Sequence, residues 1–349
     1  MRAPAAIIAA LLSAFLFGAS TPFAKVLTGE VSPVLLAGLL YLGSGLGLWT
    51  IRLLRAGPLA VPRLPPREWP WFLGAIASGG VIGPVSLMYG LTQTSASSAS
   101  LLLNLEAVMT ALIAWIVFRE NAGRRIVLGM ALIVAGGVSL AWPQAVGGQS
   151  GSIRGGLLIA GACLCWALDN NLTRKISAAD ADFIAGTKGL LAGITNVALA
   201  IALGAQFPSL PLALAAMTLG LLGYGVSLVL FVLALRGLGT ARTGAYFSTA
   251  PFLGAAVAVI ALHEPAPALF WLSACLMAAG VALHLTERHT HEHRHEPLSH
   301  SHSHAHDAHH RHEHDFEWDG AEPHVHLHGH EAMTHEHPHY PDMHHRHRH

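Results

Sequence analysis

The sequence predicts an all-α integral membrane protein with ten transmembrane helices, followed by a disordered histidine-rich tail. Two features of the composition carry this prediction. Hydrophobic residues make up 52% of the 349 residues and charged residues only 11%, which is typical of membrane proteins. The apolar residues also gather into runs of about 20, the length of helix that crosses the roughly 30 Å core of a bilayer.

Each predicted span is an apolar run bounded by charged residues, proline or glycine. The first run begins after Arg2 and continues to Lys25, so it fits a retained helix better than a cleaved signal peptide. The fifth and sixth runs are the shortest. The ten predicted spans are residues 5–26, 33–53, 70–91, 95–118, 126–142, 155–173, 182–204, 211–235, 242–262 and 267–286.

The distribution of positive charge predicts the orientation. If the N-terminus lies inside, the outer connections hold only Lys25 and Arg154, whereas the inner connections hold the other Lys and Arg residues at the helix ends. This bias places both termini in the cytoplasm, in a bacterial-type inner (plasma) membrane. The formal net charge is zero, so we expect no nucleic-acid partner. We expect neither enzymatic activity nor a required cofactor, because no nucleophile–base pair or phosphate-binding loop is visible.

The two halves of the apolar region resemble each other. "FREN…GMALIVAGG" matches "LHEP…SACLMAAGV" at one constant offset, which pairs Glu120 with Glu264 and Gly136 with Gly280. "FGASTPFAK" similarly parallels "WALDNNLTR". The sequence therefore predicts two five-helix repeats, residues 1–142 and 155–286, and an odd number of helices inverts the second copy in the membrane. The alternative is that apolar helices resemble each other through low complexity.

These residues resemble a known family. Trp166 in the sixth span, "FRE" and "LHE" at the ends of the fourth and ninth, and the paired "AGG" and "AAG" are similar to EamA-type members of the drug/metabolite transporter superfamily. The resemblance covers residues 5–286 and implies a membrane carrier, often an exporter of amino acids or other small metabolites. The sequence departs from that pattern at Phe17, where the family usually has Trp. It also has Glu106-Ala107 where a proline-containing segment is usual, although Pro251 is kept.

Six polar residues inside apolar spans are the candidate transport and coupling residues. A charge near the bilayer centre costs at least about 2.5 kcal/mol, so such side chains should face the bundle interior or a wet cavity. They are Asn104, Glu106, Asp169, Asn170, Asn171 and Lys188.

Depth in the membrane suggests different roles for these residues. Asp169 and Lys188 enter from the same side at similar depth, so they could pair directly, either as a structural ion pair or as part of the transport site. Glu106 lies near the midplane, where a carboxylate suits the binding and release of a proton or of a cationic substrate. The asparagines are more often helix–helix hydrogen-bonding residues than ligands.

The tail, residues 287–349, carries 23 of the 25 histidines and has too few large apolar residues to bury a core. "HRHEPLSHSHSH" parallels "HGHEAMTHEHPH". In an extended chain, H-x-H puts neighbouring imidazoles on one side, where they can chelate Zn, Ni, Co or Cu. The alternative is a soluble tail without a specific ligand. The candidate metal ligands are His293, His295, His300, His302, His304, His328, His330, His335, His337 and His339.

Three functions fit these features. The first is a secondary carrier that exports a small polar metabolite or amino acid, driven by the proton gradient or by exchange. The second is an exporter of Ni, Co or Zn whose tail collects the cargo. The third is a membrane-anchored metal buffer or sensor that does not transport. The expected partners are a small-molecule substrate, the lipid bilayer and divalent transition metals, and the sequence leaves a homodimer open.

Overall fold

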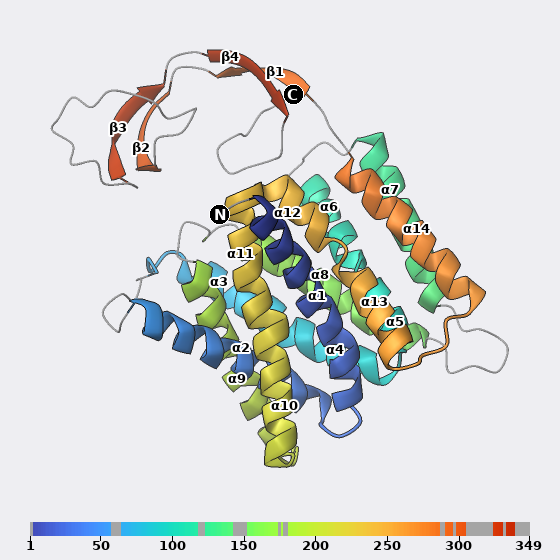
Figure 1. The fold of residues 1–349 in the computed structure, drawn as a ribbon. Helices are drawn as coiled ribbons and strands as arrows, with labels where there is room; N and C mark the ends of the chain where they lie inside the picture. The colour runs from blue at the N-terminus through green and yellow to red at the C-terminus, as the bar shows by residue number, and fades with distance from the viewer. Residues whose placement is uncertain are drawn as a thin grey trace. The chain divides into compact units, whose positions relative to one another are not determined.

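The computed structural model describes residues 3–56, 64–117, 123–141, 152–173, 176, 181–286 and four strand segments between 290 and 338. The chain divides into two compact units, Met1–Thr286 and Glu287–His349. The described part of the first unit is all-helical (Figure 1). Helices therefore supply the backbone hydrogen bonds of the apolar region internally, as a lipid environment requires.

The first half of the helical unit begins with two long helices and continues with two interrupted spans and a further helix. The interruptions are a π-helical segment, labelled η1, and a break between α5 and α6. The elements are α1 (Ala3–Leu27), α2 (Pro33–Ala56), α3 (Trp69–Ala75), η1 (Ile76–Ile82), α4 (Gly83–Thr92), α5 (Ala96–Leu102), α6 (Leu105–Val117) and α7 (Arg124–Ala141).

The second half follows the same order of straight and interrupted helices. A π segment, η3, lies between α10 and α11, and a break separates α12 from α13. The elements are α8 (Ile153–Thr173), α9 (Ala181–Ala202), α10 (Leu210–Gly220), η3 (Leu221–Val226), α11 (Ser227–Leu238), α12 (Thr240–Phe247), α13 (Ala250–Ala261) and α14 (Ala268–Leu285).

The structure differs from the expected number of spans at α8. Over the described residues, nine helical stretches are long and apolar enough to cross a membrane, and Ile153–Thr173 is not among them. Its mean hydropathy is reduced by Arg154 at one end and by the Asp169–Asn171 stretch at the other. α8 is nevertheless a packed helix, because it lies against α4, α6 and η1.

The fourth and ninth predicted spans are each two helices instead of one. In the ninth, the break at Ser248–Thr249 precedes Pro251, whose ring prevents a helix from continuing through the preceding turn. In the fourth, Asn104 lies in the break, and its side-chain amide donates to the Leu101 carbonyl at 2.9 Å. A side-chain bond of this kind competes with the backbone hydrogen bonds of a helix. The fourth span is therefore interrupted at Asn104 without a proline.

Small residues let the helices of the two halves approach closely. A Cβ added to Gly45 of α2 would overlap the backbone of Gly189 on α9. The α7 and α14 helices, which lie side by side in Figure 1, meet in the same way at Gly129 and Gly280. Close backbone packing of this kind is a main source of helix association in lipid.

The tail contains four short strands where the sequence predicted disorder. They are β1 (Thr290–His295), β2 (Leu298–His304), β3 (His324–His330) and β4 (Met333–Pro338); β1 pairs with β4 and β2 with β3, both antiparallel. The alternation of histidine with other residues has the period of an extended chain, which accounts for the difference. An isolated two-stranded ribbon is marginal in water, so these pairs do not amount to a packed core.

Candidate functional site

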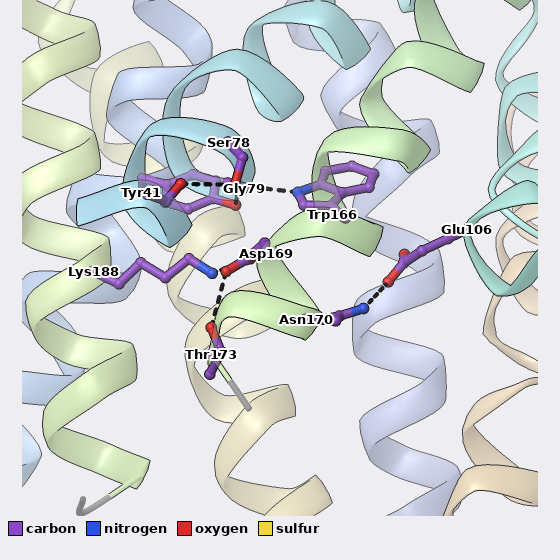
Figure 2. Close-up of polar contacts among 10 residues, drawn as sticks. Tyr41, Ser78, Gly79, Glu106, Trp166, Asp169, Asn170, Thr173 and Lys188 are labelled. Atoms are coloured by element: carbon purple, nitrogen blue, oxygen red, sulfur yellow. Dashed lines mark hydrogen bonds and ion pairs between the residues drawn. The ribbon is translucent and has the colours of Figure 1, made fainter. Parts of the chain in front are cut away.

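A polar cluster surrounds the α8 segment from Trp166 to Thr173. Side chains from α6 and α9 and the backbone of η1 meet this segment, and Tyr41 of α2 bonds to the same η1 carbonyl (Figure 2). The three charged candidates from the sequence, Glu106, Asp169 and Lys188, therefore meet at one helix. The cluster lies within the apolar helical unit, where charged groups need a specific reason to be present.

Asp169 and Lys188 form the ion pair that their predicted depths suggested. The Lys188 ammonium on α9 contacts Asp169 Oδ2, and the Thr173 hydroxyl donates to Asp169 Oδ1 at 3.0 Å. The Asp169 residue is only 5% exposed. A buried carboxylate needs both a counter-charge and hydrogen bonds to its remaining lone pairs, and these two neighbours provide them.

Glu106 lies in the first turn of α6, directly after the break that follows α5. Its side chain is half-buried, and Oε1 accepts a hydrogen bond from Asn170 Nδ2 of α8 at 2.9 Å. Asn170 is a neutral amide, so its bond to the carboxylate can be kept when the carboxylate gains or loses a proton. Among the described side chains, Glu106 is therefore oriented by a neutral amide, whereas Lys188 forms its ion pair with Asp169.

The other two asparagines bond mainly within their own chain segments. Asn171 Nδ2 donates to the Ala167 carbonyl one turn earlier on α8, at 2.8 Å. Asn104 is 5% exposed, and besides its bond to Leu101 it reaches Met277 Sδ of α14 at 3.9 Å. Of the three asparagines, only Asn170 therefore takes part in the charged cluster.

The structure adds a backbone acceptor that the sequence analysis did not identify. The Gly79 carbonyl of η1 accepts hydrogen bonds from Tyr41 Oη at 2.8 Å and from Trp166 Nε1 at 3.0 Å (Figure 2). The next carbonyl, Gly80, accepts from Asn196 Nδ2 at 3.0 Å. A π-helical turn changes the helical hydrogen-bond pattern, and such turns are frequent at functional sites. The two consecutive glycines in "IASGGVI" are the sequence signal that could have marked it.

Aromatic rings continue from the charged cluster toward the second π segment. The rings of Tyr41 and Tyr224 are 5.6 Å apart, and Tyr224 makes an edge contact with Phe17 at 6.1 Å between centroids. Tyr224 lies in η3. Carboxylates beside aromatic faces form an environment that suits an organic ammonium group.

Metal ligation was predicted only for the tail, and the structure gives backbone register there. Where side chains are described, no three His, Cys, Asp or Glu residues could hold a metal ion. In the strand pairs, several of the predicted histidines are opposite other histidines, whereas His295 is opposite Met333 and His330 is opposite Leu298. His339 lies outside the described residues. The histidine pairs are His291 with His337, His293 with His335, His300 with His328, His302 with His326 and His304 with His324.

The sequence of the helical unit matches one family model twice, over residues 4–142 and 153–286, and that model describes the EamA-like transporter family. The chain belongs to the EamA-like transporter family. It is also 28% identical over 290 residues to an uncharacterized transporter from Methanothermobacter thermautotrophicus, covering 78% of this chain and 84% of the relative. The resemblance stated from the sequence is confirmed, and the protein is a multi-pass membrane transporter.

A protein of known crystal structure shares the fold of this EamA-like transporter. The two structures superpose with a TM-score of 0.59 at 22% sequence identity, over 79% of this chain and 95% of the other. At this identity the likeness concerns the fold alone.

Proposed function

We propose that the protein is a secondary active transporter that exports a small polar metabolite or amino acid and uses Glu106 as its coupling carboxylate. The observation that carries this proposal is the contrast between two acids on neighbouring helices. Asp169 is neutralised by Lys188, whereas Glu106 is held by the neutral amide of Asn170. A carboxylate held in this way can exchange a proton or receive the ammonium group of a substrate without breaking an ion pair first.

We further propose that residues 1–142 and 155–286 are inverted repeats with ten spans in all, α8 included. The offset that pairs Glu120 with Glu264 also pairs Ile82 with Val226, the last residues of η1 and η3. The two helix breaks fall within one residue of paired positions. Inverted repeats allow two halves to exchange conformations about a central site, which is what alternating access needs.

Contacts between the halves support the same relationship. The offset pairs Gly136 with Gly280 and Gly129 with Ser273. Gly129 approaches Gly280, and Gly136 approaches Ser273. In a two-fold interface, if one residue contacts a second, their symmetry mates contact each other as well. The α7–α14 contact has this reciprocal form within one chain.

For the remaining parts of the chain we propose the arrangement expected from charge and composition. Both termini lie in the cytoplasm of a cell with a bacterial-type inner membrane, and residues 287–349 bind Zn, Ni, Co or Cu through their histidines. The support is the bias of Lys and Arg toward one side and the ligand chemistry of H-x-H. In this arrangement the tail regulates a metabolite carrier and is not part of the membrane pathway.

The experiment that tests the proposal compares the parent protein with Glu106→Gln in proteoliposomes. Transport of a panel of radiolabelled amino acids is measured from about pH 5.5 to 8.5, a range that covers the titration of coupling groups. Gln keeps the shape and a hydrogen-bonding end but has no titratable proton. We expect Glu106→Gln to insert normally and to lose most of its transport or the pH dependence of transport.

The matched control is Glu30→Gln, which removes one carboxylate from the exposed connection between α1 and α2. It should leave transport and its pH profile unchanged. Equal rates and equal pH profiles for the parent and Glu106→Gln, at matched protein levels, would show that Glu106 is not the coupling group.

A further inference from the structure

The motif "LHE" ends at Glu264, in the connection between α13 and α14. His263 has a left-handed backbone conformation with φ of 55°, as is common just after a helix. The Glu264 amide donates to the Ala258 carbonyl of α13 at 3.3 Å. The turn is therefore fixed on the end of α13, and the half-buried Glu264 side chain has a defined direction.

Both carboxylate oxygens of Glu264 bond to the beginning of α5. Ala96 N donates to Oε1 at 2.7 Å and Ser97 N donates to Oε2 at 2.8 Å. The first amides of a helix have no partner within the helix, and a carboxylate there gains both charge-assisted hydrogen bonds and a favourable helix dipole. The side chain of the N-cap residue Ser95 accepts from the amide of Ser98 and contacts the Ser97 hydroxyl at 3.4 Å, so it leaves the amides of Ala96 and Ser97 to Glu264. Glu264 therefore completes the cap of a helix in the other half of the chain.

A second charge lies at the same place. The Lys25 ammonium near the end of α1 donates to the Leu91 carbonyl in the last turn of α4. Lys25 also interacts electrostatically with Glu264. A cation at the end of α4 and an anion at the start of α5 both match the helix dipoles. The junction between α4 and α5 is thus held from α1 on one side and from the α13–α14 connection on the other.

The rest of α5 connects this junction to the coupling carboxylate. α5 has seven residues, so it is a rigid rod of about 10 Å. It packs on α13, where a Cβ added to Gly254 would lie 2.9 Å from Ser100 Oγ. Its other end is the break at Leu103–Asn104, and Glu106 follows in the first turn of α6. The position of α5 therefore sets where the break, and with it the Glu106 carboxylate, lies.

We propose that Glu264 is a positioning residue for transport. Its carboxylate holds α5 so that Glu106 meets Asn170, and the contact with Ala96 and Ser97 opens and re-forms in each transport cycle. This inference rests on the proposed role of Glu106 and extends it, because it names the contact that links the α13–α14 connection to the coupling group. The residues on this path come from both halves of the chain, as a switch between two conformations of the halves requires.

The test uses the full-length protein in proteoliposomes, with Ser97→Cys as a reporter. Ser97 is 1% exposed, so a cysteine there reacts slowly with a membrane-impermeant maleimide while α5 is capped. Adding Glu264→Gln removes the charge and leaves one acceptor for two amides. The labelling rate is corrected for the labelling of the parent protein, which lacks the Ser97→Cys reporter. We expect the corrected rate to rise about tenfold, because the loss of one charge-assisted hydrogen bond allows a change of that size. We also expect a shifted pH profile of amino-acid transport.

Glu30→Gln is the matched control for charge and should change neither measurement. An unchanged labelling rate in Glu264→Gln, or an unchanged pH profile despite faster labelling, would overturn the inference. If Glu264→Gln does not insert, Glu264→Asp, which keeps the charge but is one methylene shorter, is measured instead and should give an intermediate rise. Glu106→Gln is measured alongside: if it has no effect, the proposed function fails, whereas an effect of Glu106→Gln with none from Glu264 variants rejects this inference alone.

Discussion

The carboxylate of Asp169 on α8 occupies the space where a Cβ of residue 79 would be, directly beside the bare α-carbon of Gly79 on η1. The same glycine supplies the carbonyl that accepts from Tyr41 and Trp166. Gly79 is therefore required for two reasons at once. Its lack of a side chain admits the Asp169–Lys188 pair, and its place in the π segment presents an acceptor to two aromatic side chains.

Replacing Gly79 by alanine should disturb the cluster. The added methyl group would displace the Asp169 carboxylate, and overpacking of this kind costs about 1 to 3 kcal/mol. We expect Gly79→Ala to lower the unfolding temperature in detergent and to reduce transport in proteoliposomes. Gly161→Ala is the matched control, because a Cβ at Gly161 of α8 meets nothing within 4 Å. Equal unfolding temperatures for the two variants would contradict this account of the α8–η1 contact.

The Asp169–Lys188 pair should behave as a coupled unit. Lys188→Met leaves a buried carboxylate without its counter-charge, at a cost of about 3 kcal/mol or more. Adding Asp169→Asn removes the stranded charge, so the double variant should be more stable than Lys188→Met alone. Unfolding free energies of the parent, the two single variants and the double variant form a complete cycle. Additive costs would mean that the ion pair does not contribute to stability.

The tail should bind metal reversibly with pH and should not be needed for the fold. Imidazoles as a class have a pKa of about 6.5 and bind metal when neutral, so binding is favoured above that pH and is lost as pH falls below it. We expect the full-length protein to take up several Ni or Zn ions at about pH 7.5 and to release them near about pH 5.

Truncation after residue 288 supplies the comparison in calorimetry. It should abolish the uptake of metal while the helical unit remains inserted and monodisperse, since Met1–Thr286 forms a compact unit of its own. Uptake that is unchanged by truncation would place the metal ligands outside the tail.

Much of the helical unit was predictable because lipid imposes a simple length rule. The apolar runs are helices in the structure. Asp169 and Lys188 could be predicted as partners because an unpaired charge in an apolar span is costly. α8 shows the limit of the rule. The Asp169–Asn171 stretch marks the candidate site, but it also lowers the mean hydropathy of α8, so this helix does not qualify as a span.

What could not be predicted depends on contacts between distant residues. The break at Asn104 has no proline to mark it, and it follows from one side-chain bond to Leu101. The Gly79 acceptor exists only because Tyr41 and Trp166 arrive from other helices. The sequence shows Glu264 only as the end of the "LHE" motif, and nothing there indicates that its partners are backbone amides of α5.

The two π segments also change which faces the following helices present. A π turn accommodates one extra residue, and one residue of an α-helix corresponds to a rotation of about 100°. A helical wheel drawn through the whole of Trp69–Thr92 therefore assigns residues after Ile82 to the wrong side by roughly that angle. The same phase error occurs after Val226 in Leu210–Leu235. Residues of α4 and α11 that appear to face lipid in such a projection can thus belong to the interior, so scanning mutagenesis of either span needs a separate wheel for each side of its π turn.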